Sequence, residues 1–290
     1  DKILSYPKKL KVGALLIKAI DEKDIQFYST DEASRRQLDN LNWSGKVSDN
    51  SSGDYLQVVS TNLGGGKSDA YIERHIDHRA DIKANGDIIV TTTLTKTNNA
   101  PASDTLGYLN NVDYVRFYVP QGSILLSAGG FRAPDSSLFS QIDPSFQTDQ
   151  DLKAISGDSV IDDSSGTRIS KEFGKTVFGH WMQVKPGSTS SAYITYRLPQ
   201  RINLSDASGS LFINYWSTEY RDVDSYSLLL ERQSGIKGMT YDASVVLDPS
   251  LTTVWHDALH PDRLEVNQRL VDYTGEMGSK DFFSILVAHQ

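Results

Sequence analysis

The sequence predicts an α+β protein, in which a small N-terminal α/β unit precedes an immunoglobulin-like antiparallel β-sandwich with a long inserted loop. Three observations favour this fold class. Helical periodicity is confined to the first quarter of the chain, alternating apolar and polar residues recur after Tyr71, and Pro or Gly stands at the ends of those segments. We expect residues 1–72 to form the α/β unit and residues 73–290 to form the sandwich.

The N-terminal unit begins with two helical patterns. Leu10, Ala14 and Ile17 approximate a 3.6-residue stripe, which predicts an amphipathic helix. Ser29 with Glu32 three positions later has the form of a capping box, which predicts the start of a second helix. The segments DIQFYS and YLQVVS, before and after this second helix, predict short strands that complete the unit.

A β-hairpin is predicted over residues 75–97. Asn85-Gly86 supplies the positive φ angles of a tight turn between two alternating segments. His75 and His78 then lie on opposite faces of one strand, so they cannot bind a metal ion together, and we expect one to be half-buried and the other exposed. The inward residues of the two strands are expected to be Ile76, His78, Ala80 and Ile82, facing Ile88, Val90, Thr92 and Leu94.

Further strands are predicted along the rest of the chain. Their sequences are DYVRFYVP, SILLSA, KTVFGHWMQV, SAYITYRLP, GSLFINYW, SYSLLLERQ, MTYDASVVL, RLEVNQRLV and FFSILVA. Residues 129–174 have the weakest strand pattern and are rich in Asp, Ser and Gly, so we expect a long excursion loop there, with a short helix at residues 151–155.

Composition excludes several classes of function. The 290 residues carry a formal net charge of −8, which opposes binding to nucleic acid. The sequence has no Cys, which excludes disulfides, thiol nucleophiles and thiolate metal sites. The longest N-terminal apolar run, residues 12–20, is far shorter than a bilayer span.

The segment TNLGGGKSD resembles a nucleotide-binding loop but lacks an essential residue. Thr61 occupies the position of the first glycine of that motif, and hairpin patterns follow where a βαβ unit is required. We therefore predict no nucleotide binding and interpret the segment as a junction loop between two structural units, with Lys67 and Asp69 facing solvent or each other. Its residues are Asn62, Gly64, Gly65, Gly66, Lys67 and Asp69.

The acidic excursion loop offers oxygen ligands for calcium. Its spacing does not fit an EF-hand, because the first ligand position is occupied by Ile161. An irregular calcium site and a simple solvated loop both remain open. The calcium candidates are Asp149, Asp151, Asp158, Asp162 and Asp163.

Aromatic residues do not distinguish a binding surface from a core. Trp43, Trp181, Trp216 and Trp255 could form a carbohydrate platform, but Trp181 and Trp216 lie in predicted strands, where aromatic side chains commonly fill the core.

Several segments together resemble the C-terminal part of a family of uncharacterised bacterial envelope proteins, known as a domain of unknown function. The segments are KDIQFYSTDEASRRQLDNLNWSG, DYLQVVSTNLGGGKSDAYIER, NNVDYVRFYVPQGS, EFGKTVFGHWMQVKPG and YITYRLP. The resemblance spans residues 23–233 and implies an extracytoplasmic location. It also implies a membrane anchor upstream of Asp1, and it supplies no catalytic residues.

The sequence therefore predicts an extracytoplasmic structural or binding module of a bacterial cell surface, with an unidentified glycan or protein ligand. We identify no nucleophile–base pair and no cofactor motif, so no catalytic or cofactor-binding residue is predicted. Two alternatives remain. One is a calcium-stabilised adhesin-like module, and the other is an envelope glycan-acting enzyme with carboxylates drawn from Glu73, Asp77, Asp113 and Glu219.

Overall fold

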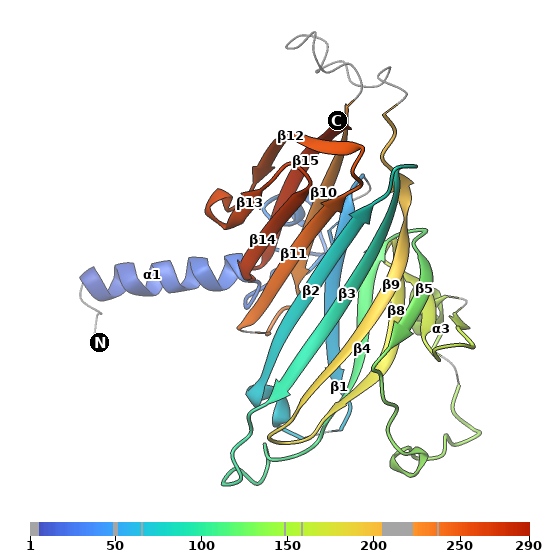
Figure 1. Ribbon diagram of the computed structural model, residues 1–290. Coiled ribbons are helices and arrows are strands. Elements are labelled where there is room, and N and C mark those ends of the chain that lie inside the picture. Colours follow the sequence, from blue (N-terminus) through green and yellow to red (C-terminus); the bar gives the residue numbers. More distant parts are fainter. Residues whose placement is uncertain are drawn as a thin grey trace.

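The computed structural model describes residues 6–48, 52–64, 66–147, 149–157, 159–204, 223–236 and 238–290. The described chain is mostly β, and two sheets pack face to face (Figure 1). Two helices, α1 (Tyr6–Asp21) and α2 (Glu32–Asn40), precede the first strand.

Sheet A has eight strands among the described residues. In spatial order they are β12 (Leu251–Ala258), β15 (Lys280–His289), β10 (Val223–Arg232), β1 (Asp54–Asn62), β4 (Asn111–Pro120), β8 (Lys175–Val184), β7 (Arg168–Glu172) and β6 (Val160–Ile161).

Sheet B has seven strands within the same described ranges. Their order is β13 (Leu264–Val266), β14 (Leu270–Glu276), β11 (Met239–Leu247), β2 (Ile72–Ile82), β3 (Asp87–Asn98), β9 (Thr189–Arg201) and β5 (Ile124–Gly129).

The predicted hairpin is confirmed as β2 and β3. Gly86 has φ +81°, and the inward residues pair as predicted, from Ile76 opposite Leu94 to Ile82 opposite Ile88. The expectation for the two histidines was partly wrong. His75 is half-buried on the outer face, whereas His78 is buried completely between the sheets.

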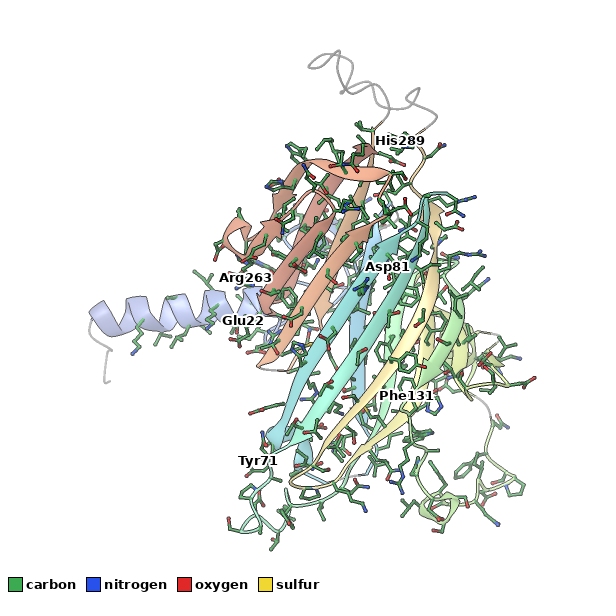
Figure 2. The ribbon with its side chains drawn as sticks, in the orientation of Figure 1. Glu22, Tyr71, Asp81, Phe131, Arg263 and His289 are labelled. Carbon is green, nitrogen blue, oxygen red and sulfur yellow. The ribbon has the colours of Figure 1, made fainter. Side chains whose placement is uncertain are left out.

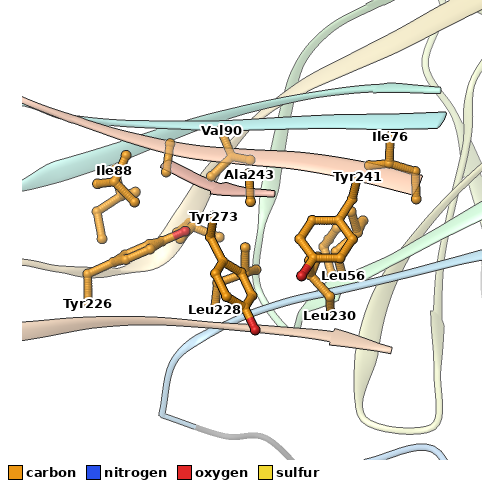
Figure 3. Packing of buried hydrophobic residues seen from close by; sticks show 14 of the residues in the cluster. Leu56, Ile76, Ile88, Val90, Tyr226, Leu228, Leu230, Tyr241, Ala243 and Tyr273 are labelled. Carbon is orange, nitrogen blue, oxygen red and sulfur yellow. The ribbon is translucent and has the colours of Figure 1, made fainter. Parts of the chain in front are cut away.

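The core lies between the inner faces of the two sheets (Figure 3). Tyr226, Leu228 and Leu230 come from β10 in sheet A, and Tyr241 from β11 in sheet B, and all of them are buried. Alternation along each strand places one set of side chains in this layer and the other set outside, as required by the period-two geometry of a strand.

The prediction of an immunoglobulin-like antiparallel sandwich was wrong in its topology, although a sandwich is present. Both sheets are mixed, because β1 pairs in parallel with β10 in sheet A and β2 pairs in parallel with β11 in sheet B. The path of the chain accounts for the parallel pairing. The connection from β1 to β2 and the connection from β10 to β11 both run from sheet A to sheet B, so the strands that they join run in matching directions.

The prediction of a separate small α/β unit was also wrong, because β1 lies in the middle of sheet A. Residues 24–29 form no strand, and the N-cap of α2 is Asp31, which accepts a hydrogen bond from Ser34 N at 2.8 Å, in place of Ser29. Helix α1 extends away from the sandwich (Figure 1), and Val12, Leu15, Leu16 and Ile17 of this helix are exposed. In the described part of the chain, none of the helices has the length and apolar character that a membrane span needs.

The expected long inserted loop is partly ordered into secondary structure. It contains the 3₁₀ helix η2 (Ser136–Leu138), helix α3 (Gln150–Ser156), and strands β6 and β7, which extend the edge of sheet A. Helix α3 matches the helix expected at residues 151–155. Strand β12 was not predicted, and GSLFINYW lies outside the described residues.

Candidate functional site

The junction loop connects β1 in sheet A with β2 in sheet B. It ends in the 3₁₀ helix η1 (Ser68–Tyr71), and Figure 2 places Tyr71 at the end of the sandwich remote from His289. The loop therefore joins the two sheets of one sandwich. Gly65 lies outside the described residues.

Asn62 holds the junction loop in a compact turn. Its side-chain Nδ2 donates to Gly66 O and to Ser68 Oγ, each at 3.3 Å, and its Oδ1 accepts from Gly64 N at 3.1 Å. Ser68 is completely buried, which agrees with its position inside this set of hydrogen bonds. The Asn62 side chain thus adds to the backbone hydrogen bonds that Leu63 N and Gly64 N donate to Val112 O as the chain leaves β1.

Gly64 and Gly66 are closely packed against neighbouring side chains, and neither has a positive φ angle. A Cβ atom on Gly64 would lie 3.3 Å from Val112 Cβ, and one on Gly66 would lie 2.8 Å from Leu109 Cδ1. Lys67 is exposed, and its backbone N donates to Leu106 O at 3.0 Å. The loop therefore packs against residues 106–112, which lie before and at the start of β4.

Asp69 pairs with Arg74 on β2 and does not face Lys67. Arg74 Nη2 donates to Asp69 Oδ1 at 2.9 Å, and Asn111 Nδ2 donates to the same oxygen at 3.1 Å. Arg74 is buried, whereas 44% of the Asp69 side chain is exposed. Burial lowers the pKa of Arg74 from its ordinary value, and the Asp69 carboxylate opposes that shift.

A second ion pair lies beneath the first, between the sheets. Lys96 Nζ on β3 donates to Asp113 Oδ2 on β4 and to Asn111 Oδ1, the latter at 2.9 Å. Both charged side chains are fully buried, and burial lowers the pKa of Lys96 although Asp113 opposes the shift. Such a pair is costly to break, because the remaining partner would be a buried uncompensated charge.

A polar hollow opens beside the junction loop. It measures about 390 Å³ and lies between the β1–β2 connection and the β10–β11 connection. Gln233 fixes one wall, because its side-chain Oε1 accepts from Ser60 N at 2.7 Å and its Nε2 donates to Ser60 O at 3.1 Å. The lining residues used below are Ser60, Asp69, Ala70, Arg74, Gln233 and Ser234.

Most of this site was missed by sequence reasoning, although a signal was present. Arg74 and Lys96 occupy inward positions of β2 and β3, in register with the apolar residues of the hairpin. A charged residue on the core face of an alternating strand needs a buried partner. The partners of Arg74 and Lys96 are Asp69 and Asp113. Both lie in segments that the alternating pattern of β2 and β3 does not identify as neighbours.

Among the described calcium candidates, Asp149 and Asp151 lie at the N-terminus of α3, and Asp162 and Asp163 lie at a turn after β6. Asp149 caps α3 by accepting from Asp151 N at 2.8 Å, and Asp162 Oδ2 accepts from Ser165 N at 2.9 Å. The Ser164 and Ser165 hydroxyls and amide hold the pKa of Asp162 below its ordinary value. Asp158 lies outside the described residues, and calcium binding by Asp149, Asp151, Asp162 and Asp163 stays a prediction.

Of the carboxylates considered for glycan hydrolysis, the three that the structure describes, Glu73, Asp77 and Asp113, do not share a cleft. Asp113 is buried between the sheets, whereas Glu73 and Asp77 are exposed on the outer face of sheet B. A glycosidase needs two carboxyl groups on either side of one bond. Glu219 lies outside the described residues.

The tryptophans of the described chain do not form one platform. Trp181 on β8 packs against Tyr114, with ring centroids 5.0 Å apart, and Trp255 lies on β12. These strands are five places apart in sheet A, which corresponds to about 24 Å at the usual strand spacing. Trp43 packs against Phe27, and Trp216 lies outside the described residues.

A buried polar cluster ties the two sheets together near their centre. Asp54 Oδ2 on β1 accepts from Tyr226 Oη at 2.8 Å and lies 3.0 Å from His78 Nε2 on β2. His78 Nδ1 lies 3.0 Å from Thr92 Oγ1 on β3. Because Asp54 and His78 are fully buried, the cluster fixes the two sheets against each other.

The chain overlaps in part with several solved structures. A Legionella pneumophila protein with a provisional assignment as a nutrient-binding protein matches with a TM-score of 0.40 and 7% identity, over 82% of this chain and 72% of that one. The M1 zinc metallopeptidase of Deinococcus radiodurans matches with a TM-score of 0.29 and 12% identity, over 76% and 43%. A provisionally assigned Parabacteroides distasonis protease matches with a TM-score of 0.29 and 7% identity, over 76% and 40%.

These overlaps are too small to support a fold or function assignment. The chain spans less than half of the length of the two peptidase chains. No protein-family model and no curated protein matches the sequence.

Proposed function

We propose that this chain is an extracytoplasmic binding module of a bacterial cell surface, which holds a sugar unit of an envelope glycan in the hollow beside the junction loop. The location rests on the resemblance to envelope-anchored proteins described above. The choice of site rests on the hollow itself, whose volume of about 390 Å³ lies within the range of small-ligand sites.

The chemistry of the lining supports a ligand rich in hydroxyl groups. Arg74 offers only hydrogen-bond donors and Asp69 only acceptors, while Ser60 and Ser234 offer both. A hydroxyl group donates and accepts at once, so a sugar can use all of these groups. The Asp69–Arg74 pair and the Gln233–Ser60 hydrogen bonds hold the walls in place before any ligand arrives, which lowers the entropic cost of binding.

Binding is favoured over catalysis by the position of the ionisable groups. The pairs Lys96–Asp113 and His78–Asp54 are fully buried between the sheets, where a substrate in the hollow cannot reach them. Their burial supports a structural role.

Blocking the hollow tests this proposal. Ala70 is exposed and lines the hollow, so Ala70→Trp fills the space without removing a polar contact of the walls. Ala102→Trp, at another exposed alanine, is the matched control. Co-sedimentation with purified cell-wall glycan is expected to retain the wild type and Ala102→Trp and to lose Ala70→Trp. Equal retention of all three proteins, or of none, contradicts the proposal.

A further inference from the structure

Three metal-ligating side chains meet on the outer face of sheet B, away from the hollow. His75 and Asp77 lie two positions apart on β2, so both side chains are on its outer face. The register places Asp77 beside Asp242 on the parallel strand β11. Within the described ranges, one ligand atom from each of these residues lies within 4.8 Å of the other two. All three side chains are carried by paired strands, which position ligands more firmly than loops do.

The distances between the ligand atoms fit a small divalent cation. His75 Nε2 lies 3.4 Å from Asp77 Oδ1 and 3.6 Å from Asp242 Oδ2. Ligands at about 2.1 Å in a tetrahedral arrangement are about 3.4 Å apart, so an ion could enter with little movement of the side chains. The exposed fractions of 34%, 54% and 59% leave the site open to solvent.

The surroundings orient the imidazole and attract a cation. Thr240 Oγ1 lies 2.8 Å from His75 Nδ1, which leaves Nε2 directed at the two carboxylates. Asp77 and Asp242 are neighbouring like charges, an arrangement that destabilises a sheet unless positive charge compensates for it. Asp272 on β14, paired with Glu265 on β13, adds further negative charge on the same face of sheet B.

We propose that His75, Asp77 and Asp242 bind one divalent transition-metal cation of the zinc type. The nitrogen ligand favours such an ion over Mg²⁺ or Ca²⁺, which prefer oxygen ligands. The site does not depend on the proposed glycan site, because His75 and Arg74 point to opposite faces of β2. The competing explanation is that His75 contacts the two carboxylates directly and no metal ion binds.

Calorimetric titration of the full chain with Zn²⁺, after dialysis against chelator, separates these explanations. The wild type is expected to bind one equivalent, and His75→Gln and Asp242→Asn are expected to weaken binding at least about tenfold. Thr240→Val is expected to weaken it about 10- to 100-fold, because it removes only the partner of Nδ1. Asp272→Asn, which removes a negative charge from the same face but no ligand, is the control and is expected to change binding less than about threefold.

Histidine ¹⁵N spectra identify the coordinating atom directly. The Nε2 resonance of His75 is expected to shift with Zn²⁺ in wild type and in Asp272→Asn. The proposal is overturned if no saturable binding is observed, or if binding is unchanged in His75→Gln. It is also overturned if Mg²⁺ binds as tightly as Zn²⁺.

Discussion

Lys23 and Glu231 lie 208 residues apart in the chain, and Lys23 Nζ donates to Glu231 Oε1 at 2.7 Å in a buried ion pair. Tyr55 Oη and Ser48 N donate to the other carboxylate oxygen of Glu231, at 2.8 and 3.1 Å. Lys23 follows α1, and Glu231 lies on β10. The pair therefore attaches the N-terminal helical region to sheet A.

Removing Lys23 is expected to destabilise the protein strongly. Lys23→Met removes the buried cation of Glu231 and leaves only Lys280, whose Nζ lies 3.6 Å from Glu231 Oε1, so the loss is expected to reach up to about 3–5 kcal/mol. Lys18→Met is the control, because its ion pair with Glu22, at 3.6 Å, is exposed and contributes less than about 1 kcal/mol. Urea unfolding of the three proteins measures the difference. Similar losses in both variants contradict a structural role for the Lys23–Glu231 pair.

The same pair predicts a loss of stability in acid. Burial by itself raises the pKa of Glu231, but the hydrogen bonds from Lys23 and Tyr55 outweigh it and hold the pKa below its ordinary value. The stabilisation is therefore present above the unfolded-state pKa of about 4.3 and is lost as pH falls through the folded-state pKa. The free-energy difference between wild type and Glu231→Gln should shrink as pH falls from 7 to 3. A difference that does not depend on pH is the contrary result.

Asp281 on β15 is expected to behave in the opposite way. Burial raises its pKa, although Tyr273, Arg263 and His260 partly offset the shift. Ionisation therefore destabilises the fold as pH rises above the unfolded-state pKa of about 3.9. Asp281→Asn should raise the thermal midpoint relative to wild type more at pH 7 than at pH 3.5. A larger gain at the acidic pH would mean that the sign of the shift is wrong.

Substitutions at two glycines in turns distinguish the cost of backbone strain from the cost of a steric clash. Gly86 and Gly187 both have positive φ angles, +81° and +70°, but a Cβ on Gly86 would lie 2.0 Å from Ile202 O, whereas one on Gly187 meets nothing within 4 Å. Gly187→Ala should cost about 1–3 kcal/mol from strain alone. Gly86→Ala should cost about 1–3 kcal/mol more, because the neighbouring backbone must move. Chemical denaturation checks this, and equal losses would rule out the close contact.

The hairpin of β2 and β3 could be predicted because its information is local. Asn85-Gly86 sets the turn, and alternation on both sides sets the inward faces. The parallel pairs could not be predicted in the same way. β1 and β10 are far apart in the sequence, and neither strand carries a pattern that identifies the other as its partner. The immunoglobulin-like topology was wrong because strand patterns do not show which distant strands pair, and two of those pairs are parallel.

The residues around the hollow differ in the same way, because some contacts are local in the sequence and others join distant segments. The compact turn around Asn62 involves residues close in sequence, so a loop could be predicted there, but not that it joins the two sheets of one sandwich. The partners of Arg74 and Lys96, and the wall formed by Gln233, depend on the packing of the two sheets. Alternation places these charges inward but does not specify what they contact.

The most direct test of the proposed function is to map where a glycan binds. Backbone amide NMR of the full chain, titrated with soluble cell-wall glycan fragments, should show saturable shifts at Ser60, Ala70 and the 233–236 turn. The account predicts that these shifts disappear in Ala70→Trp and persist in Ala102→Trp. Shifts confined to other surfaces, or unchanged by Ala70→Trp, would contradict the assignment of the hollow as the binding site.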